Sequence, residues 1–469
     1  MNVNDRSNHR NNFEYDIPSH FNHLKFSKHS DKESFEVPSQ IISHSKNSKK
    51  QVIHPINRFS KALKEHELSD EIIQKIFDQA QKIELGMSAS ILDGENSFYL
   101  NCDRERLSLY NLSEIQEIGR GTFGIVYRVQ NLVQGIFEVL KMAKVGKNSA
   151  ENAIQHEIKN LRRLHKILGE KKVKGLQDCP SVFLENGYIG KQYDCDLNTV
   201  IKEELFKSED ALNAILQLLS GLSFMHASNL LHGDIKGRNI LVDTVAKTCH
   251  LADLGGARFI DELDYKSFIH TTIATASTDM DEFVELIEKI LQQENKIKNI
   301  HPKYVSEIRK DRMRLKKMKE EYVDRRRAHD VFSLGFTFYQ LFTKNHYPYF
   351  QTEDDYMNTM GQVNSLELES GINRLMGDFV NKVQKNQLID LILKMLNPNL
   401  DLRPTARRAY EMIQNILNSR SNEYRIDCAE ISHLPFANID EKQEDLSDVG
   451  GLSSHYFSEE LSLQKNLSE

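Results

Sequence analysis

The chain has 469 residues and a formal net charge of −7, and 39% of its residues are hydrophobic. A chain of this length can bury a large core, and it contains no run of roughly 18 apolar residues that could span a membrane. Its polar first residues do not resemble a secretory signal peptide, and its five scattered cysteines form no C-x-x-C pair. The mild acidity provides no electrostatic basis for binding nucleic acid. We therefore expect a soluble protein of a reducing cytosol.

Composition divides the chain into four parts. Residues 1–60 are rich in Asn, Ser, His and Lys, and we expect them to be disordered. Residues 61–113 are expected to form a helical extension, whereas residues 114–416 alternate apolar runs with turn residues, as a folded domain does. Residues 417–469 form a polar, acidic tail. Catalytic chemistry is therefore expected within residues 114–416.

A helix is predicted over residues 69–84. Ser69 can cap its first turn, which also contains acidic residues. Its apolar face consists of Ile72, Ile73, Ile76 and Phe77. This spacing is typical of an amphipathic helix.

A motif of the form G-x-G-x-x-G lies near the start of the folded domain. Its glycines are Gly119, Gly121 and Gly124, and Val126 follows them. Because the residues after the glycines favour a strand, we expect a strand–turn–strand element. A dinucleotide-binding fold would need a helix at this point. Glycine has no Cβ atom, so such a turn can bring the main chain close to a phosphate group.

A lysine and a glutamate are predicted to form an ion pair. Lys141 lies inside a short apolar strand, where an unpaired charge is costly. The next predicted helix, over residues 149–168, carries Glu157 beside its apolar face. Glu157 is the natural partner of Lys141, although each residue alone would more often be a solvated charge.

Two later segments bring carboxylate, cationic and amide side chains together. One loop between apolar anchors carries Asp234, Lys236 and Asn239, and Asp253 follows the next apolar run. Asn239 and Asp253 offer oxygen ligands that suit Mg²⁺. Asp234 can accept a proton, and Lys236 can neutralise a transferring phosphoryl group.

In this order, the motifs resemble those of a eukaryotic-type serine/threonine protein kinase. Residues 330–335 (DVFSLG) resemble a buried helix of that family, and residues 400–406 (LDLRPTA) resemble its arginine-containing motif near the end of the domain. The resemblance implies an α+β, bilobal protein kinase fold. We therefore expect a small β-rich N-lobe with one helix and a larger helical C-lobe.

The resemblance also implies that the chain binds ATP and Mg²⁺. The glycine backbone would cover the phosphates, the lysine–glutamate pair would hold two of them, and the remaining residues would contact the adenine. The implied ATP-binding residues are Gly119, Gly121, Gly124, Val126, Lys141, Glu157, Tyr193 and Leu241. The implied magnesium ligands are Asn239 and Asp253.

Catalysis is assigned by the same resemblance to Asp234 and Lys236. Asp234 would orient the attacking hydroxyl group and accept its proton, and Lys236 would stabilise the γ-phosphate. A lysine at this position resembles serine/threonine kinases, so the expected substrate is a serine or threonine of a protein. One alternative is a pseudokinase that binds nucleotide or scaffolds partners, and another is a small-molecule kinase on the same fold. The sequence does not predict the oligomeric state.

The chain departs from the family pattern at several positions. Gly233 replaces the arginine that normally precedes the catalytic aspartate and pairs with a phosphorylated activation loop, so we expect constitutive activity. Val139 replaces an alanine and Leu254 replaces a phenylalanine, and both exchanges are apolar. No A-P-E triplet follows Asp253, and residues 271–278 lie where the substrate-facing loop is expected.

The sequence leaves two sets of candidates for the acidic partner of Arg403. The A-P-E glutamate would normally fill this role. One set of candidates consists of Asp279, Asp281 and Glu282. The other set consists of Glu320 and Glu321.

A charged insert of about 40 residues is predicted within 281–327. It begins as an amphipathic helix and ends in a basic segment, residues 309–319, with seven basic residues and one acidic residue. One interpretation is a solvated helical decoration. The other is a docking surface for a substrate, an acidic partner or an anionic membrane.

The last residues suggest where the protein acts. Residues 440–469 contain eight acidic residues and two lysines, with interspersed serines. This tail resembles the glutamate-rich export signals of proteins that intracellular bacteria inject through type IV secretion. The resemblance implies a kinase secreted by a bacterium into the host cytoplasm, and the alternative is an ordinary acidic tail.

Overall fold

The chain divides into two compact units. The first comprises Met1–Lys166 and Asp178–Tyr193, and the second comprises Ile167–Gln177 and Asp194–Glu469. The computed structural model describes residues 66, 68–82, 88–93, 96–103, 106–144, 148–169, 171–263, 280–301, 304–344 and 365–418. The segment predicted to be disordered (1–60), the loop 271–278 and the tail beyond residue 418 lie outside the described residues.

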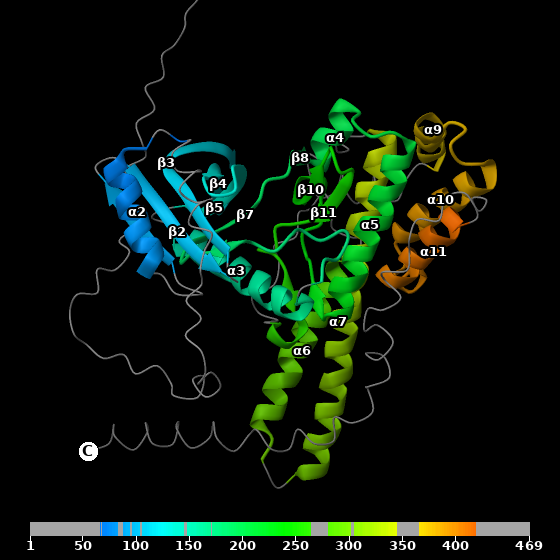
Figure 1. The fold of residues 1–469 in the computed structure, drawn as a ribbon. Helices are drawn as coiled ribbons and strands as arrows, with labels where there is room; N and C mark the ends of the chain where they lie inside the picture. Colours follow the sequence, from blue (N-terminus) through cyan, green and yellow to red (C-terminus); the bar gives the residue numbers. More distant parts are fainter. Residues whose placement is uncertain are drawn as a thin grey trace, which may run out of the picture. The chain divides into compact units, whose positions relative to one another are not determined.

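A seven-stranded antiparallel sheet forms the framework of the first unit (Figure 1). Its strand order is β1-β2-β3-β4-β5-β7-β6. The strands are β1 (Ser88–Asp93), β2 (Asn96–Asp103), β3 (Arg106–Arg120), β4 (Gly124–Asn131), β5 (Ile136–Ala143), β6 (Val182–Phe183) and β7 (Gly187–Lys191). The unit also contains helices α2 (Asp70–Lys82) and α3 (Asn148–Leu168).

The extension before the folded domain contains more strand than helix. Helix α2 confirms the predicted helix, and the Ser69 hydroxyl accepts a hydrogen bond from the Ile72 N–H at 3.3 Å. The following residues form β1, β2 and the start of β3, which corrects the expectation of a helical segment over 61–113. In β2 every second residue faces the same side, so Phe98 and Leu100 pack with α2 while Tyr99 packs in the opposite cluster.

The second unit is mainly helical. Its helices are α4 (Leu197–Glu203), α5 (Ser208–Ala227), α6 (Met280–Asn299), α7 (Val305–Thr343), α9 (Ser365–Met376), α10 (Lys382–Met395) and α11 (Ala406–Asn418). Short strands form two small sheets: β8 (Cys195–Asp196), β10 (Ile240–Asp243) and β11 (Thr248–Leu251) in one, β9 (Leu230–Leu231) and β12 (Arg258–Phe259) in the other. None of the described helices is both long and apolar enough to cross a membrane.

The charged insert forms a helical hairpin of α6 and the first part of α7, which lie side by side in Figure 1. The predicted apolar face at its start is confirmed, because Phe283, Ile287 and Ile290 are buried. The Phe283 ring stacks on Tyr322 with centroids 4.9 Å apart. Helix α7 continues without a break into the buried segment around Asp330. The second part of the insert and this buried segment therefore belong to one helix of 39 residues.

Candidate active site

The glycine motif forms the turn between β3 and β4. Gly119 pairs with Val126 across the two strands, and the Gly121 N–H donates to the Gly124 carbonyl at 2.9 Å. The predicted strand–turn–strand element is thus confirmed. A Cβ atom at Gly124 would lie 3.1 Å from the Met142 carbonyl oxygen, so glycine is needed there for β5 to approach. Gly121 and the two residues after it are exposed, which leaves their main chain accessible to a ligand.

The predicted ion pair of Lys141 and Glu157 is confirmed within the first unit. The Lys141 Nζ atom lies 2.8 Å from Oε2 and 2.9 Å from Oε1 of Glu157. The Tyr188 hydroxyl donates a further hydrogen bond to Glu157 at 2.9 Å. Only 2% of the Glu157 side chain is exposed, so this pair is held in a low-dielectric environment where its geometry is well defined.

The loop after β9 positions Asp234 through two neighbours. The Lys236 ammonium group donates to both carboxylate oxygens of Asp234, at 2.8 and 3.0 Å. The Asn239 amide donates to the Asp234 carbonyl at 2.8 Å and to its carboxylate at 3.0 Å. Because about a fifth of the Asp234 and Lys236 side chains is exposed, both groups are fixed in place yet accessible.

Asp253 follows β11 in a backbone conformation that is uncommon for a residue with a side chain. Its φ angle is +61°, in the left-handed region. Such conformations often occur at functional sites, where the surrounding structure compensates for the strain. Leu254 is 1% exposed, so the apolar residue expected after Asp253 serves as a core residue.

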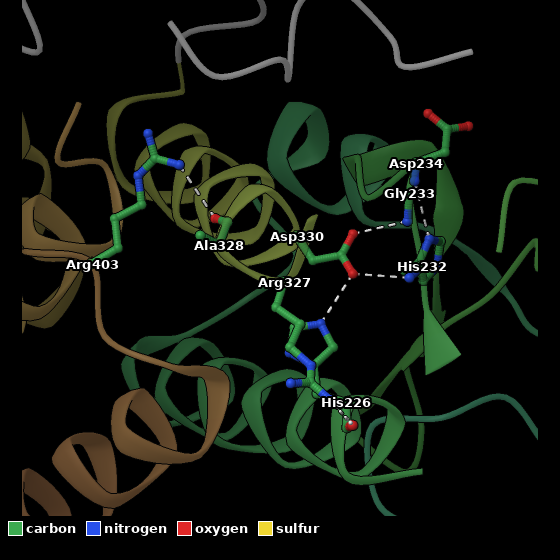
Figure 2. A network of polar contacts seen from close by, with 8 residues as sticks. All are labelled: His226, His232, Gly233, Asp234, Arg327, Ala328, Asp330 and Arg403. Carbon is green, nitrogen blue, oxygen red and sulfur yellow. Dashed lines mark hydrogen bonds and ion pairs between the residues drawn. The ribbon is translucent and has the colours of Figure 1, made fainter. Parts of the chain in front are cut away.

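Asp330 of α7 anchors the loop that carries Asp234 (Figure 2). Its carboxylate accepts hydrogen bonds from the main-chain N–H groups of His232 (2.9 Å) and Gly233 (2.8 Å), and it lies 3.0 Å from the His226 Nε2 atom. Burial alone would raise the pKa of the Asp330 carboxyl. The hydrogen bond with His226 and electrostatic interactions with His226, His232 and Arg326 outweigh burial and hold this pKa well below its ordinary value. Asp330 is therefore a buried anion at neutral pH.

The remaining predicted ATP-binding residues are distributed over both units. Val126 is half-buried in β4 of the first unit, and Leu241 is half-buried in β10 of the second. Tyr193 is the last residue of the first unit, and its hydroxyl oxygen accepts a hydrogen bond from the Asp178 N–H at 2.9 Å.

Comparison with known proteins identifies the family that this part of the chain resembles. The family model of the protein kinase domain matches residues 112–277. The fold is that of a eukaryotic-type protein kinase. The kinase match begins near the β3–β4 glycine turn and includes the Lys141–Glu157 pair, the Asp234 loop and Asp253.

Several curated kinases are similar to this chain over its kinase domain. A sporulation protein kinase of Schizosaccharomyces pombe is 32% identical over 158 residues, which cover 30% of this chain and 28% of that protein. MAP3K epsilon protein kinase 1 of Arabidopsis thaliana is 32% identical over 180 residues, 36% of this chain and 12% of that protein. Serine/threonine-protein kinase Tao of Drosophila melanogaster is 38% identical over 149 residues, 31% of this chain and 14% of that protein. The matched segment thus spans less than a third of each relative.

Protein kinases use ATP and Mg²⁺, and the donor set of the kinase domain fits magnesium. The Asn239 amide nitrogen is engaged by Asp234, so its Oδ1 atom is the end that can bind a cation. Among the described residues, no cluster of three or more histidine, cysteine, aspartate or glutamate side chains could hold a metal alone. Proteins commonly bind Mg²⁺ through one or two side chains together with substrate phosphates.

Gly233 lies beside Arg326, a residue that no motif in the sequence indicates. Its φ angle is +78°, and a Cβ atom there would lie 2.9 Å from the Arg326 Nη2 atom and 3.1 Å from the Gly256 carbonyl oxygen. Arg326 is only 6% exposed, and this burial lowers the pKa of its guanidinium group, an effect opposed by Tyr322 and Asp330. The kinase family's arginine is thus absent from the loop itself, while a cation from α7 lies next to the same position.

The two candidate sets for the partner of Arg403 fare differently. Glu320 and Glu321 pair with cations of their own helix, Lys316 at 3.8 Å and Arg325 at 3.2 Å. Asp279 and the side chains of Asp281 and Glu282 lie outside the described residues. The Arg403 guanidinium donates to the Ala328 carbonyl at 3.4 Å and lies over the Phe332 ring at 4.8 Å.

Proposed function

We propose that this chain is an active serine/threonine protein kinase, which transfers the γ-phosphate of ATP to a hydroxyl group of a protein. The observation that carries the proposal is the Asp234 carboxylate, held by Lys236 and Asn239 on a loop that Asp330 anchors. A carboxylate fixed in this way can orient a substrate hydroxyl group without reorganising during the reaction.

Each element of the site has one task in the proposed reaction. Asp234 orients the attacking hydroxyl group and accepts its proton, and Lys236 stabilises the negative charge on the transferred phosphoryl group. Lys141 holds the α- and β-phosphates, while the Glu157 carboxylate keeps its ammonium group in place. When bound to Asn239 and Asp253, Mg²⁺ neutralises phosphate charge. Catalysis then consists of positioning and charge stabilisation.

Constitutive activity forms part of the proposal. In this chain the cation beside Gly233 is Arg326, which is buried and therefore needs no phosphorylated loop to bring it into position. The anion that holds the catalytic loop, Asp330, is likewise built into α7. The loop geometry is thus supported by two buried residues of α7, neither of which needs a phosphorylated loop.

Radiolabelled ATP provides the test. The full chain, produced in bacteria and treated with phosphatase, is expected to label itself or a generic protein substrate on serine and threonine. Asp234→Asn should reduce this labelling at least roughly 10²-fold, because the general base is lost. Labelling mainly on tyrosine would contradict the substrate class, and activity that disappears only after phosphatase treatment would contradict constitutive activity. A folded, ATP-binding but inactive protein would instead support the pseudokinase alternative.

We also propose that the kinase is a bacterial effector that acts on host proteins. The acidic tail with interspersed serines supports this idea, and the exposed basic side chains of Arg312, Arg314 and Lys317 on α7 suit an anionic membrane surface. The last 30 residues, fused to a reporter, should reach host cytosol from a secreting strain and not from a strain that lacks the transporter. Equal delivery from both strains, or delivery from neither, would reject the effector role and leave the kinase proposal unaffected.

A further inference from the structure

A cavity of about 450 Å³ lies within the second unit, and Asp234 is not among its lining residues. It is bounded by the end of α5, the middle of α7 and the beginning of α11, and it is open to solvent on one side. Three arginines line it, Arg327, Arg403 and Arg407, and Asp324 is the acidic member of its lining. The volume lies within the range of small-molecule sites, and the lining has an excess of positive charge.

Arg327 is an arginine that α7 contributes to this lining. Its guanidinium pairs with Asp324 at 3.5 Å and donates to the Asn229 side chain at 3.2 Å, and Figure 2 shows it extending toward His226. Among the described residues, its Nε–H is buried and has no hydrogen-bond partner. The Arg327 side chain as a whole is 36% exposed, so its guanidinium group is accessible to a ligand although the Nε atom is not.

The other two arginines lie at different depths. Arg403 is 7% exposed, and its guanidinium group is oriented by main-chain carbonyl oxygens and by the Phe332 ring. The Arg407 side chain is 56% exposed, and it pairs with Glu411 of the same helix at 3.4 Å. The cavity thus offers one deep cation and one at its rim.

Helix α11 adds polar and apolar features to the same wall. The Thr405 hydroxyl accepts a hydrogen bond from the Arg408 N–H, and the helix begins at Ala406, so its positive N-terminal end adjoins the cavity. Val331, Leu400 and Pro404 provide hydrocarbon surface beside the arginines. A bare inorganic anion would leave this surface uncovered.

We propose that the cavity binds an organic phosphate monoester, with the phosphate between the arginines and the organic group against the apolar wall. A dianion matches the excess charge of the lining, and arginine presents paired N–H donors that fit phosphate oxygens. The monoester could be a free metabolite or a lipid headgroup, which share this chemistry. The inference does not depend on the proposed kinase activity, because it concerns binding.

The cavity is connected to the catalytic loop by a short path of contacts. His226 lines the cavity, and its Nε2 atom lies 3.0 Å from Asp330, whose carboxylate holds the main chain of His232 and Gly233 (Figure 2). The Arg327 guanidinium also lies within 3.5 Å of the His226 carbonyl oxygen. A phosphate bound to Arg327 would therefore be connected to Asp330, the anchor of the loop, through Arg327 and His226.

The test compares neighbouring arginines of one helix. Arg407 and Arg408 both pair with Glu411, but only Arg407 lines the cavity. Titration of the full chain with phenyl phosphate, in buffer free of phosphate and sulfate, should show affinity that falls about tenfold or more in Arg407→Gln and in Arg327→Gln. Arg408→Gln, which removes the same charge, should change the affinity less than about twofold.

A second arm distinguishes the two sources of the monoester. Phosphatidylcholine vesicles with and without phosphatidic acid are compared for binding to the same three variants. If phosphatidic acid binds, and Arg407→Gln and Arg327→Gln weaken this binding while Arg408→Gln does not, the ligand is a lipid headgroup. Tight binding of phenyl phosphate without binding of phosphatidic acid indicates a soluble compound. The proposal is overturned if neither probe binds, or if Arg408→Gln weakens binding as much as Arg407→Gln does. Binding unaffected by all three substitutions would place the ligand elsewhere and would equally overturn it.

Discussion

Replacing Lys141 by methionine is expected to reduce phosphoryl transfer at least about 10³-fold, equivalent to roughly 4 kcal/mol in the barrier. We assign the Lys141 ammonium group of the first unit to the ATP phosphates. Methionine has a side chain of similar length but carries no charge. The variant should remain folded but less stable by about 1–3 kcal/mol, because Glu157 stays buried with the Tyr188 hydroxyl as a partner.

The measurement is the initial rate of transfer from radiolabelled ATP, with the midpoint of thermal unfolding recorded for each variant. Lys159→Met is a matched control, since Lys159 lies on α3 two residues after Glu157 and is exposed. Near-normal turnover in Lys141→Met would refute the assignment of the phosphate-binding lysine. A comparable loss in Lys159→Met would indicate an effect of charge in general.

Replacing Asp330 by alanine is expected to lower the free energy of unfolding by about 3–5 kcal/mol, and to abolish transfer as well. The substitution leaves the N–H groups of His232 and Gly233 and the His226 ring buried without their acceptor, so the loop that carries Asp234 loses its anchor. Asp324→Ala, on the same helix with 74% of its side chain exposed, should change stability by less than about 1 kcal/mol. Urea unfolding followed by circular dichroism measures both values, and similar losses in the two variants would contradict a special role for Asp330.

The loss of stability in acid should differ between the natural protein and Asp330→Asn. The folded-state pKa of Asp330 is lowered, so its contribution to stability is fully present above the unfolded pKa near 4 and is lost as pH falls toward the folded value. The free energy of unfolding of the natural protein should therefore decrease more steeply between pH 5 and pH 3 than that of Asp330→Asn. Parallel slopes would show that another carboxylate governs the acid response.

Local sequence was sufficient for the parts of the site whose residues lie close together in the chain. The glycine turn followed from three glycines next to β-favouring residues, and the loop geometry of Asp234, Lys236 and Asn239 needs only six consecutive positions. The Lys141–Glu157 pair could also be predicted, because a charge inside an apolar strand demands a partner and the next helix offers one.

Other features became visible only in the folded chain. The alternating pattern of β2 can be recognised in the sequence. That β2 extends the kinase sheet depends on its pairing with β1 and β3, which the sequence of one strand does not specify. The sequence did not predict that the charged insert continues directly into the buried segment of α7. The apolar pattern changes from that of a solvated helix to that of a core helix, although the helical backbone is continuous.

By itself, the sequence determined the protein kinase fold, because its motifs occur in the order typical of that family. It also predicted the residues that we assign to the chemistry, since each motif combines the required residue types at short spacing. Tertiary structure decided which groups support them. His226 and Asp330 are 104 residues apart yet in contact, Arg326 lies beside Gly233, and Arg327, Arg403 and Arg407 line one cavity. The physical reason is that such contacts are set by the packing of α5, α7 and α11 against one another, and a buried charge acquires its partners only when these helices enclose it.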